Sequence, residues 1–428
     1  MRIKIRWGLI LASLALTSLL VACGDSVNQK VPDSNQSNHN SLSGVTTQEL
    51  EFLSYYTGGY ASDTGFYTSH IRDGGHHNIC YVDFATGQEI VLCNQINCTH
   101  DSDACNSWVE GNGDGPVYKT IPVGDKIVLL YQGLTDSFGN PTPSYVAIMN
   151  PDGTNRHIVQ ELGLSTGLGT VDCGGYVRDM ENLYFITSDA ETFSYTLRRV
   201  HLPTETVEKI CDLEGEEEQI IGCTEKDLIL SYTPGGAGMS REKRQKMKTK
   251  IVRLNVDTRE KVELLEHQAC DYGACADEKF YIVNSLEKTI CTYDLIDGAL
   301  LQEIPVEDPT LLDQESVVWP HGIYDGRFLV DNGSNSYLGI DPETGKLTGL
   351  KHTFFTQDGA GQSICWVETQ TEDGFLIVSG ATAEKYTFID EEGKECMSTA
   401  YFPTHNLISK DDFWNNHGNG VPIVDARN

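Results

Sequence analysis

The chain is short of basic residues. It has 31 Lys and Arg against 62 Asp and Glu among 428 residues, a formal net charge of −31. Such an acidic excess repels phosphate groups, so the composition argues against nucleic acid as a partner. A basic run between Pro234 and Lys250 is one local patch. A solvated hairpin over the acidic surface explains it more simply than contact with anionic lipid or an acidic partner.

The sequence also lacks a sustained helical period and the short motifs of common enzyme sites. It contains no Gly-x-Ser-x-Gly, no His-Glu-x-x-His, no phosphate-binding loop and no calcium-binding acidic loop. Neighbouring acids such as Asp411 and Asp412 point apart in a strand or turn. These absences weaken the case for an enzyme without excluding it, because an active site can draw its acids from strands far apart in the sequence.

The first 43 residues have the pattern of an export signal and a tether. Three basic residues precede an apolar stretch, 7–21, that is too short to span a membrane comfortably but suits a signal peptide. Leu20-Val21-Ala22-Cys23 resembles the lipobox of bacterial lipoproteins, whose cysteine is diacylated and becomes the new N-terminus. The resemblance implies a signal peptide over 1–22 and a lipidated Cys23 with a flexible polar linker over 23–43. An ordinary cleaved signal or a buried apolar helix is the alternative.

A lipid on Cys23 predicts where the folded part, residues 44–428, works. It would hold that part on the extracytoplasmic side of the cell membrane. The expected partners are the membrane itself, through the N-terminal lipid, and an extracellular protein, peptide or glycan.

The folded part repeats one unit seven times. Each unit is an apolar or aromatic strand, a short polar break, a second strand and a turn. The second strands end 39 to 67 residues apart, near Asp83, Asn150, Leu202, Asn255, Asp294, Asp341 and Asp390. Spacings of about 40 to 50 residues are typical of propeller blades, which bury both faces only when they stack in a ring. The sequence therefore predicts an all-β fold, a single β-propeller of seven blades. Eight is the alternative, because the longest spacing could hide another hairpin.

The turns after the second strands resemble those of quinoprotein-like and TolB-like propeller repeats. The Asp-x-x-Thr-Gly pattern occurs at Asp83-Phe84-Ala85-Thr86-Gly87 and Asp341-Pro342-Glu343-Thr344-Gly345. Asp opens an Asx turn and Gly takes a positive φ, so these turns specify fold rather than activity. The tryptophans that dock blades in pyrroloquinoline quinone enzymes are missing, so that cofactor is not predicted. We expect the ring to close by pairing of the segment 50–56 or the one around Ile423.

Three thiols and one imidazole lie within thirteen residues, as Cys93, Cys98, His100 and Cys105. They are a complete ligand set for structural zinc, although cysteines of exported proteins usually pair and an even number remains once Cys23 is lipidated. The spacing is similar to a zinc knuckle without matching it. The cluster, which follows an apolar strand and a turn, resembles one in lipid-anchored, propeller-like proteins of anaerobic Gram-positive bacteria. The sequence does not decide between disulfides and a structural zinc ion at this cluster. It predicts no other cofactor.

Two loops combine an aromatic ring with an imidazole: Trp319 with His321, and Trp414 with His417. On an axial face such side chains could stack on carbohydrate or peptide, although packing between blades is the simpler interpretation. The sequence thus predicts a surface-anchored, non-catalytic binding or scaffold module for a protein, peptide or glycan. The alternative is an extracytoplasmic hydrolase or lyase that acts on a glycan or peptide at the axis.

Overall fold

The computed structural model describes residues 49–427, apart from 55–56, 112–117, 134–141, 165, 169–174, 190, 216–217, 236–242, 244–245, 270–271, 285–286, 309–318, 332–336, 356–361 and 390–392. The signal peptide, Cys23 and the linker predicted for 1–43 lie outside the described residues. Contacts divide the chain into Met1–Thr46 and Thr47–Asn428, and every described residue belongs to the second unit. In the described part, no helix is long and apolar enough to cross a membrane.

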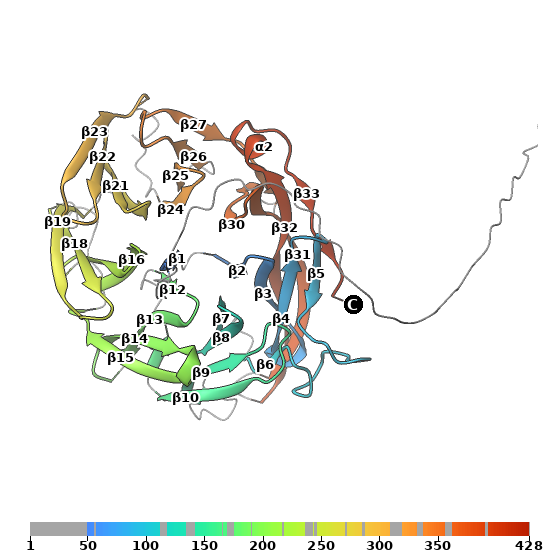
Figure 1. The fold of residues 1–428 in the computed structure, drawn as a ribbon. Coiled ribbons are helices and arrows are strands. Elements are labelled where there is room, and N and C mark those ends of the chain that lie inside the picture. The colour runs from blue at the N-terminus through green and yellow to red at the C-terminus, as the bar shows by residue number, and fades with distance from the viewer. Residues whose placement is uncertain are drawn as a thin grey trace, which may run out of the picture. The chain divides into compact units, whose positions relative to one another are not determined.

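Seven antiparallel sheets form the blades of a β-propeller (Figure 1). The prediction of an all-β, seven-bladed fold is confirmed, and the eight-bladed alternative is wrong. In the first three blades the four main strands are β2 (Tyr60–Ser62), β3 (Gly65–Ile71), β4 (His77–Asp83) and β5 (Gln88–Val91); β7 (Tyr118–Val123), β8 (Lys126–Tyr131), β9 (Ser144–Met149) and β10 (His157–Gly163); and β12 (Tyr176–Arg178), β13 (Asn182–Asp189), β14 (Ser194–His201) and β15 (Thr206–Asp212).

The other four blades have the same order of strands. They are β16 (Glu218–Cys223), β17 (Asp227–Tyr232), β18 (Lys248–Asn255) and β19 (Lys261–Gln268); β20 (Tyr272–Ala276), β21 (Lys279–Asn284), β22 (Thr289–Asp294) and β23 (Leu300–Pro305); β24 (Trp319–Tyr324), β25 (Arg327–Asp331), β26 (Tyr337–Ile340) and β27 (Leu347–Leu350); and β30 (Val367–Gln370), β31 (Gly374–Ile389), β32 (Glu395–Ser409) and β33 (Val421–Pro422). The pair β28 (Thr353–Phe355) and β29 (Gln362–Ile364) lies before blade 7, and α2 (Lys410–Trp414) follows β32.

The apolar strands that open the seven predicted hairpins are the second strands of the blades in chain order. In β8 and β13 successive side chains point to opposite faces, and both faces are covered by a neighbouring blade. Leu130 of blade 2 and Phe185 of blade 3, for example, share one buried cluster. The apolar character of these strands therefore reflects burial on both sides, as it does in other stacked sheets.

The predicted turns form as expected. The Asp83 carboxylate accepts the N–H groups of Ala85 and Thr86 at 2.8 and 2.9 Å, and Gly87 has a φ of 64°. The turn at Asp341 has the same bonds, and a Cβ on its Gly345 would lie 2.3 Å from the Pro305 carbonyl oxygen of the preceding blade. Glycine is required there both by the positive φ and by the close approach of blade 5.

The longest spacing between the ends of two predicted hairpins, from Asp83 to Asn150, contains the cysteine-rich segment. After Cys105 the chain returns to blade 1 as β6 (Trp108–Val109), which pairs with β4 at His77 and Asn78. The extra length is thus accounted for in part by an insertion on blade 1.

The C-terminal segment closes the ring. β33 adds to blade 7 and β34 (Val424–Asp425) pairs in parallel with β5 of blade 1. The N–H groups of Val424 and Ala426 donate to Gly87 and Glu89 at 2.9 and 2.8 Å. Of the two segments expected to close the ring, the one around Ile423 does so.

The other candidate, near Leu50, has a different role. β1 (Glu51–Leu53) pairs with the inner strand β12 of blade 3, at the axis of the ring (Figure 1). Arg178 holds this arrangement, because its guanidinium bonds to Glu51, to the Ala61 carbonyl and to the Pro122 carbonyl. The N-terminal segment therefore occupies the central axis and does not close the ring.

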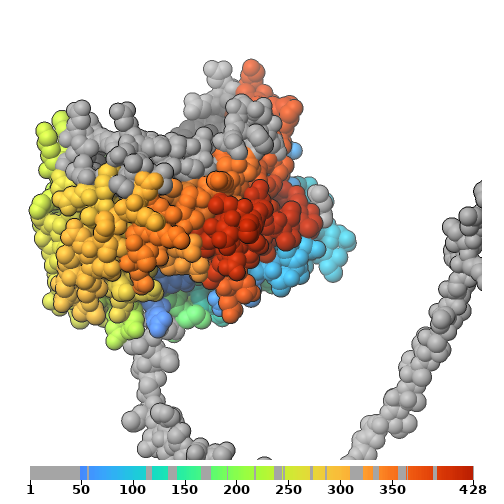
Figure 2. All heavy atoms as spheres, turned by 90° about the horizontal axis from the view of Figure 1, so that it is seen from above, coloured from blue at the N-terminus to red at the C-terminus, as the bar shows by residue number. Residues whose placement is uncertain are grey.

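The closing seam, between blades 7 and 1, differs from the other six. Among the described residues each of the six has a buried apolar cluster of five to twelve residues, whereas the closing seam has two clusters of three, around Phe66 and around Phe402. In Figure 2 the red C-terminal residues lie against the light-blue residues of blade 1. Polar groups and the added strand β34 supply the rest of this contact.

We predict that Val424→Pro weakens the closure, because proline cannot donate to the Gly87 carbonyl. The free energy of unfolding should fall by about 1–3 kcal/mol, measured by urea unfolding of the detergent-purified full chain. Val424→Ala keeps the N–H group at a residue that is 57% exposed, so its effect should stay within about 0.5 kcal/mol. Equal losses in both variants would contradict closure through this hydrogen bond.

Candidate metal centre and axial site

The cysteine-rich loop is shaped by its own polar side chains. The Gln95 amide donates to the Ala104 carbonyl and to the Asn106 side chain, both at 2.9 Å, and Asn106 donates to Asn94 at 3.0 Å. Asn97 and His100 have positive φ values of 59° and 58°, which turn the chain tightly on either side of Cys98. These contacts bring the two ends of the loop together.

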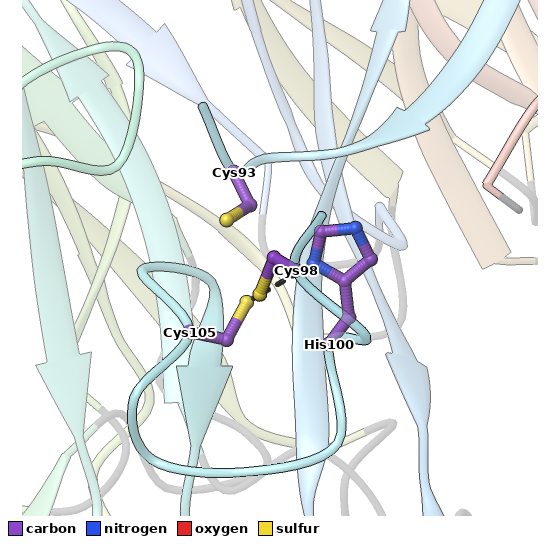
Figure 3. Close-up of side chains that lie close together, drawn as sticks. All are labelled: Cys93, Cys98, His100 and Cys105. Carbon is purple, nitrogen blue, oxygen red and sulfur yellow. Dashed lines mark hydrogen bonds between the residues drawn. The ribbon is translucent and has the colours of Figure 1, made fainter. Parts of the chain in front are cut away.

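As a result the four predicted ligands converge. One donor atom each of Cys93, Cys98, His100 and Cys105 lies within 4.8 Å of all the others. Figure 3 shows the three sulfur atoms and the imidazole directed toward a common point. Two sulfurs bound to one zinc ion lie about 3.8 Å apart. The cluster can therefore bind a metal ion after small shifts of the side chains, and its donor set fits zinc.

A disulfide accounts for less of this geometry. All three cysteines are free thiols in the structure, and His100 Nδ1 lies 3.2 Å from the Cys105 sulfur. A disulfide joins two sulfurs and gives neither the third thiol nor the imidazole a reason to converge. The arrangement favours the metal interpretation of the two that the sequence leaves open.

The protonation states suit metal binding. Partial burial opposes ionisation of Cys93, but hydrogen bonds from the backbone of Gln95 and Asn106 bring its thiol pKa below the usual value. Burial lowers the pKa of His100, with a smaller contribution from Arg72, so the imidazole stays neutral as a ligand must. Burial raises the pKa of Cys105 to about 11, so a metal ion must displace its proton.

A chain of hydrogen bonds supports the cluster from inside blade 1. The Asn78 amide donates to Ser107 Oγ at 3.0 Å, which leaves the Ser107 hydroxyl free to donate to Cys105 Sγ, also at 3.0 Å. The Arg72 guanidinium in turn donates to Asn78. Asn78 and Ser107 are fully buried. Such outer-shell partners orient ligands, and a nearby cation offsets the net negative charge of a zinc ion bound by three thiolates.

A second polar network lies at the axis and was missed in the sequence. Glu368 of β30 has a fully buried side chain. Its carboxylate accepts the Gly58 N–H at 2.6 Å and the Trp366 indole N–H at 3.1 Å, and His405 Nε2 lies 3.9 Å away. The sequence offered little signal, because β30 reads Val-Glu-Thr-Gln and an acid in such a strand is usually exposed. The carboxylate ties the N-terminal segment to blade 7.

One small cavity of the described part lies beside this network. A cavity of about 30 Å³ is lined by residues of β2, β3 and β7, including Tyr118 and Lys119. This volume holds about two water molecules. Burial lowers the pKa of the Lys119 ammonium, while Glu368 opposes that effect. The cavity is too small for a sugar ring or a peptide.

Of the four residues predicted to form an aromatic binding surface, the structure describes the side chains of Trp414 and His417, which have different surroundings. Trp414 is 5% exposed and packs between blades 6 and 7, with the Arg327 guanidinium 4.5 Å from its ring centre and its indole N–H donated to Asp325. His417, three residues later, has a side chain that is 72% exposed. The side chains of Trp319 and His321 lie outside the described residues. For Trp414, packing between blades is the interpretation that fits.

Known proteins resemble the chain only distantly. No protein-family model and no curated protein matches it. Among solved structures, TolB from Acinetobacter baumannii is 13% identical, with a TM-score of 0.34 and coverage of 79% of this chain and 78% of that one. An oligogalacturonate lyase in complex with manganese is 11% identical, with a TM-score of 0.36 and coverage of 78% and 84%. A puromycin hydrolase is 12% identical with a TM-score of 0.44, and this chain spans 58% of its length. None of these similarities assigns an activity.

We predict that Cys98→Ser abolishes metal binding by the loop, because a hydroxyl is a poor substitute for a thiolate ligand. Mass spectrometry of the purified full chain should show one metal ion fewer per chain. Ser107→Ala should keep the ion but weaken its affinity about 10- to 100-fold in a chelator competition. The control is Cys291→Ser, a partly buried cysteine of β22, which should change neither value. Unchanged metal content in Cys98→Ser would refute the site.

Proposed function

We propose that this chain is an extracytoplasmic lipoprotein, anchored through a lipid on Cys23, whose propeller is a non-catalytic binding or scaffold module for a protein, peptide or glycan. A structural zinc ion bound by Cys93, Cys98, His100 and Cys105 stabilises the loop on blade 1. The predicted signal peptide is 1–22, the linker 23–43 and the propeller 44–428.

The non-catalytic assignment rests on the strand and the buried carboxylate that lie at the axis. Propeller enzymes can assemble catalytic side chains from several blades around the axis. Here β1 pairs with β12 in that position, and Glu368 is buried with its carboxylate bonded to Gly58 and Trp366. A general acid or base must be able to reach its substrate, and this carboxylate cannot. Partners therefore bind outside the axis.

The course of the N-terminal segment is consistent with the anchor. Leu50 lies at the inner edge of blade 4, where the Cys223 thiol donates to its carbonyl at 3.3 Å. Leu50 and β1 therefore lie on the axial side of the ring. In this proposal the outer strands of the blades are left to bind a partner.

The loop with the four ligands has a structural role in this proposal. A zinc ion with four protein ligands has no open position for substrate or water. The loop also reaches blade 2, because Asn94 donates to Asp152 at 3.0 Å. The ion therefore rigidifies the contact between two blades, and chelation should loosen it.

A hydrolase or lyase is the alternative, and one observation favours it. Glu368 of blade 7 lies 3.9 Å from His405 Nε2 and also acts on the Lys119 ammonium of blade 2, whose pKa burial lowers. Titratable groups that converge from separate blades are a common feature of active sites. This function would require β1 and the Gly58 segment to move away.

We predict that Cys23→Ala detaches the protein from the membrane, since the thiol is the acceptor of the lipid. In a bacterial host fed an alkyne-labelled fatty acid, the wild-type chain should carry label and sediment with membranes. The variant should lose the label and be at least tenfold enriched in the soluble fraction. Cys211→Ala, a partly buried cysteine of β15, is the matched control and should behave as wild type. Full labelling of Cys23→Ala would refute the anchor.

Binding without cleavage tests the module itself. We predict that the full chain in detergent is retained on at least one member of a panel of immobilised cell-wall glycans, host glycans and peptides, without releasing reducing ends or amines. Glu368→Gln, which preserves the shape of the side chain, should leave that affinity within about twofold. Bond cleavage that falls by 100-fold or more in Glu368→Gln would establish the hydrolase or lyase instead.

A further inference from the structure

A second group of donor atoms lies inside blade 1, at the closing seam. His70, Cys80 and Glu89 come from the successive strands β3, β4 and β5, and one donor atom of each lies within 4.8 Å of the other two. The three residues are 3%, 0% and 6% exposed. Rigid neighbouring strands place them on one face of the sheet, which is the arrangement that a precise binding site requires.

We propose that His70 Nε2, Cys80 Sγ and a carboxylate oxygen of Glu89 bind a second divalent metal ion of the zinc class. This site is independent of the Cys93–Cys105 loop and of the proposed function. An imidazole, a thiolate and a carboxylate are each ordinary zinc ligands, and their mixture of hard and soft donors does not suit calcium or magnesium.

The distances allow this assignment with little movement. His70 Nε2 and Glu89 Oε1 are 2.8 Å apart. Ligand atoms around one zinc ion lie about 3.3 to 3.8 Å apart, so the pair must open by about 0.5 Å or slightly more. Cys80 Sγ has only the Asn78 carbonyl as a weak acceptor, at 3.8 Å. Three protein ligands leave a fourth position for water.

The surroundings of His70 resemble the outer shell of a metal site. Its Nδ1 has no hydrogen-bond partner in the described part of the chain and lies 3.8 Å from Glu384 of blade 7. A histidine that binds a metal through one nitrogen commonly donates the other N–H to a carboxylate. Arg427 holds that carboxylate at 3.2 Å, and the Phe402 ring lies over the imidazole at 4.4 Å.

The charged groups around the three donors also favour a cation at this position. Around the donors lie three carboxylates, Glu89, Glu384 and Asp425, with Arg427 and Arg72 as the guanidinium groups that act on Cys80. The carboxylates thus outnumber the guanidinium groups by one, and a cation at this position would offset their charge. Binding of zinc would displace the proton of Cys80 Sγ.

The position gives the ion a structural effect. It would join β3, β4 and β5, and β5 is the strand with which β34 pairs. Through Glu384 it would also contact blade 7, so the ion would stabilise the closing seam, where the apolar clusters are smallest. Zinc in the Cys93–Cys105 loop would not stabilise this seam.

The test is the zinc content of the detergent-purified full chain, reduced, stripped with a chelator and reloaded with zinc. We expect two zinc ions per chain in the wild type. Cys80→Ser and Glu89→Gln should each contain one, and Cys98→Ser should also contain one. Cobalt-loaded Cys98→Ser should show a thiolate-to-cobalt absorption band. The double variant, Cys80→Ser with Cys98→Ser, should lack this band. Cys291→Ser should keep both ions.

Glu89→Gln decides the matter if Cys80→Ser fails to fold, because glutamine preserves the side-chain shape and a hydrogen bond to His70. Circular dichroism checks that each variant is folded. One zinc ion in the wild type that is lost in Cys98→Ser and retained in Glu89→Gln would overturn the proposal. So would two ions in a folded Glu89→Gln variant whose zinc affinity equals that of the wild type.

Discussion

Each blade of this propeller is a small sheet with two apolar faces, so its stability depends on closure of the ring. Six seams are filled by apolar side chains from blades that follow each other in the chain. The seventh must join residues about 300 positions apart, and its apolar clusters are the smallest of the described part. The chain compensates with β34 and with Glu384 of blade 7, which pairs with Arg427 and lies 3.8 Å from His70 of blade 1. Closure therefore rests on directional polar contacts as well as on hydrophobic burial.

Blade 1 carries most of the unusual chemistry because it is the blade at which the ring closes. Its outer strand β5 pairs with β34 and is followed directly by the four-ligand loop. The face of the blade at the closing seam holds His70, Cys80 and Glu89. Cross-linking by metal ions within one blade requires no long-range fit between distant parts of the chain. A zinc ion in the loop and a second ion in the seam would both stiffen the sheet on which the last strand must dock.

The sequence was informative where the physical cause is local. The repeated unit of two strands and a turn predicted the seven blades, Asx turns predicted the bends at Asp83 and Asp341, and ligand types predicted the cluster around Cys98. The site at the seam could not be read in the same way. It depends on Glu384 lying beside His70, and nothing in either strand specifies that neighbour. Likewise, Glu368 carries no local sign that Gly58 will bond to it.

Hydrogen exchange of the full chain, followed by mass spectrometry, tests the closure most directly. The amides of Val424 and Ala426 donate to blade 1, so the account predicts that peptides covering them exchange as slowly as those of β4 in the buried core. The outer edge of β5 should be protected to the same degree. Exchange of the C-terminal peptides within seconds, with β4 still protected, would contradict it and would mean that another contact holds the ring together.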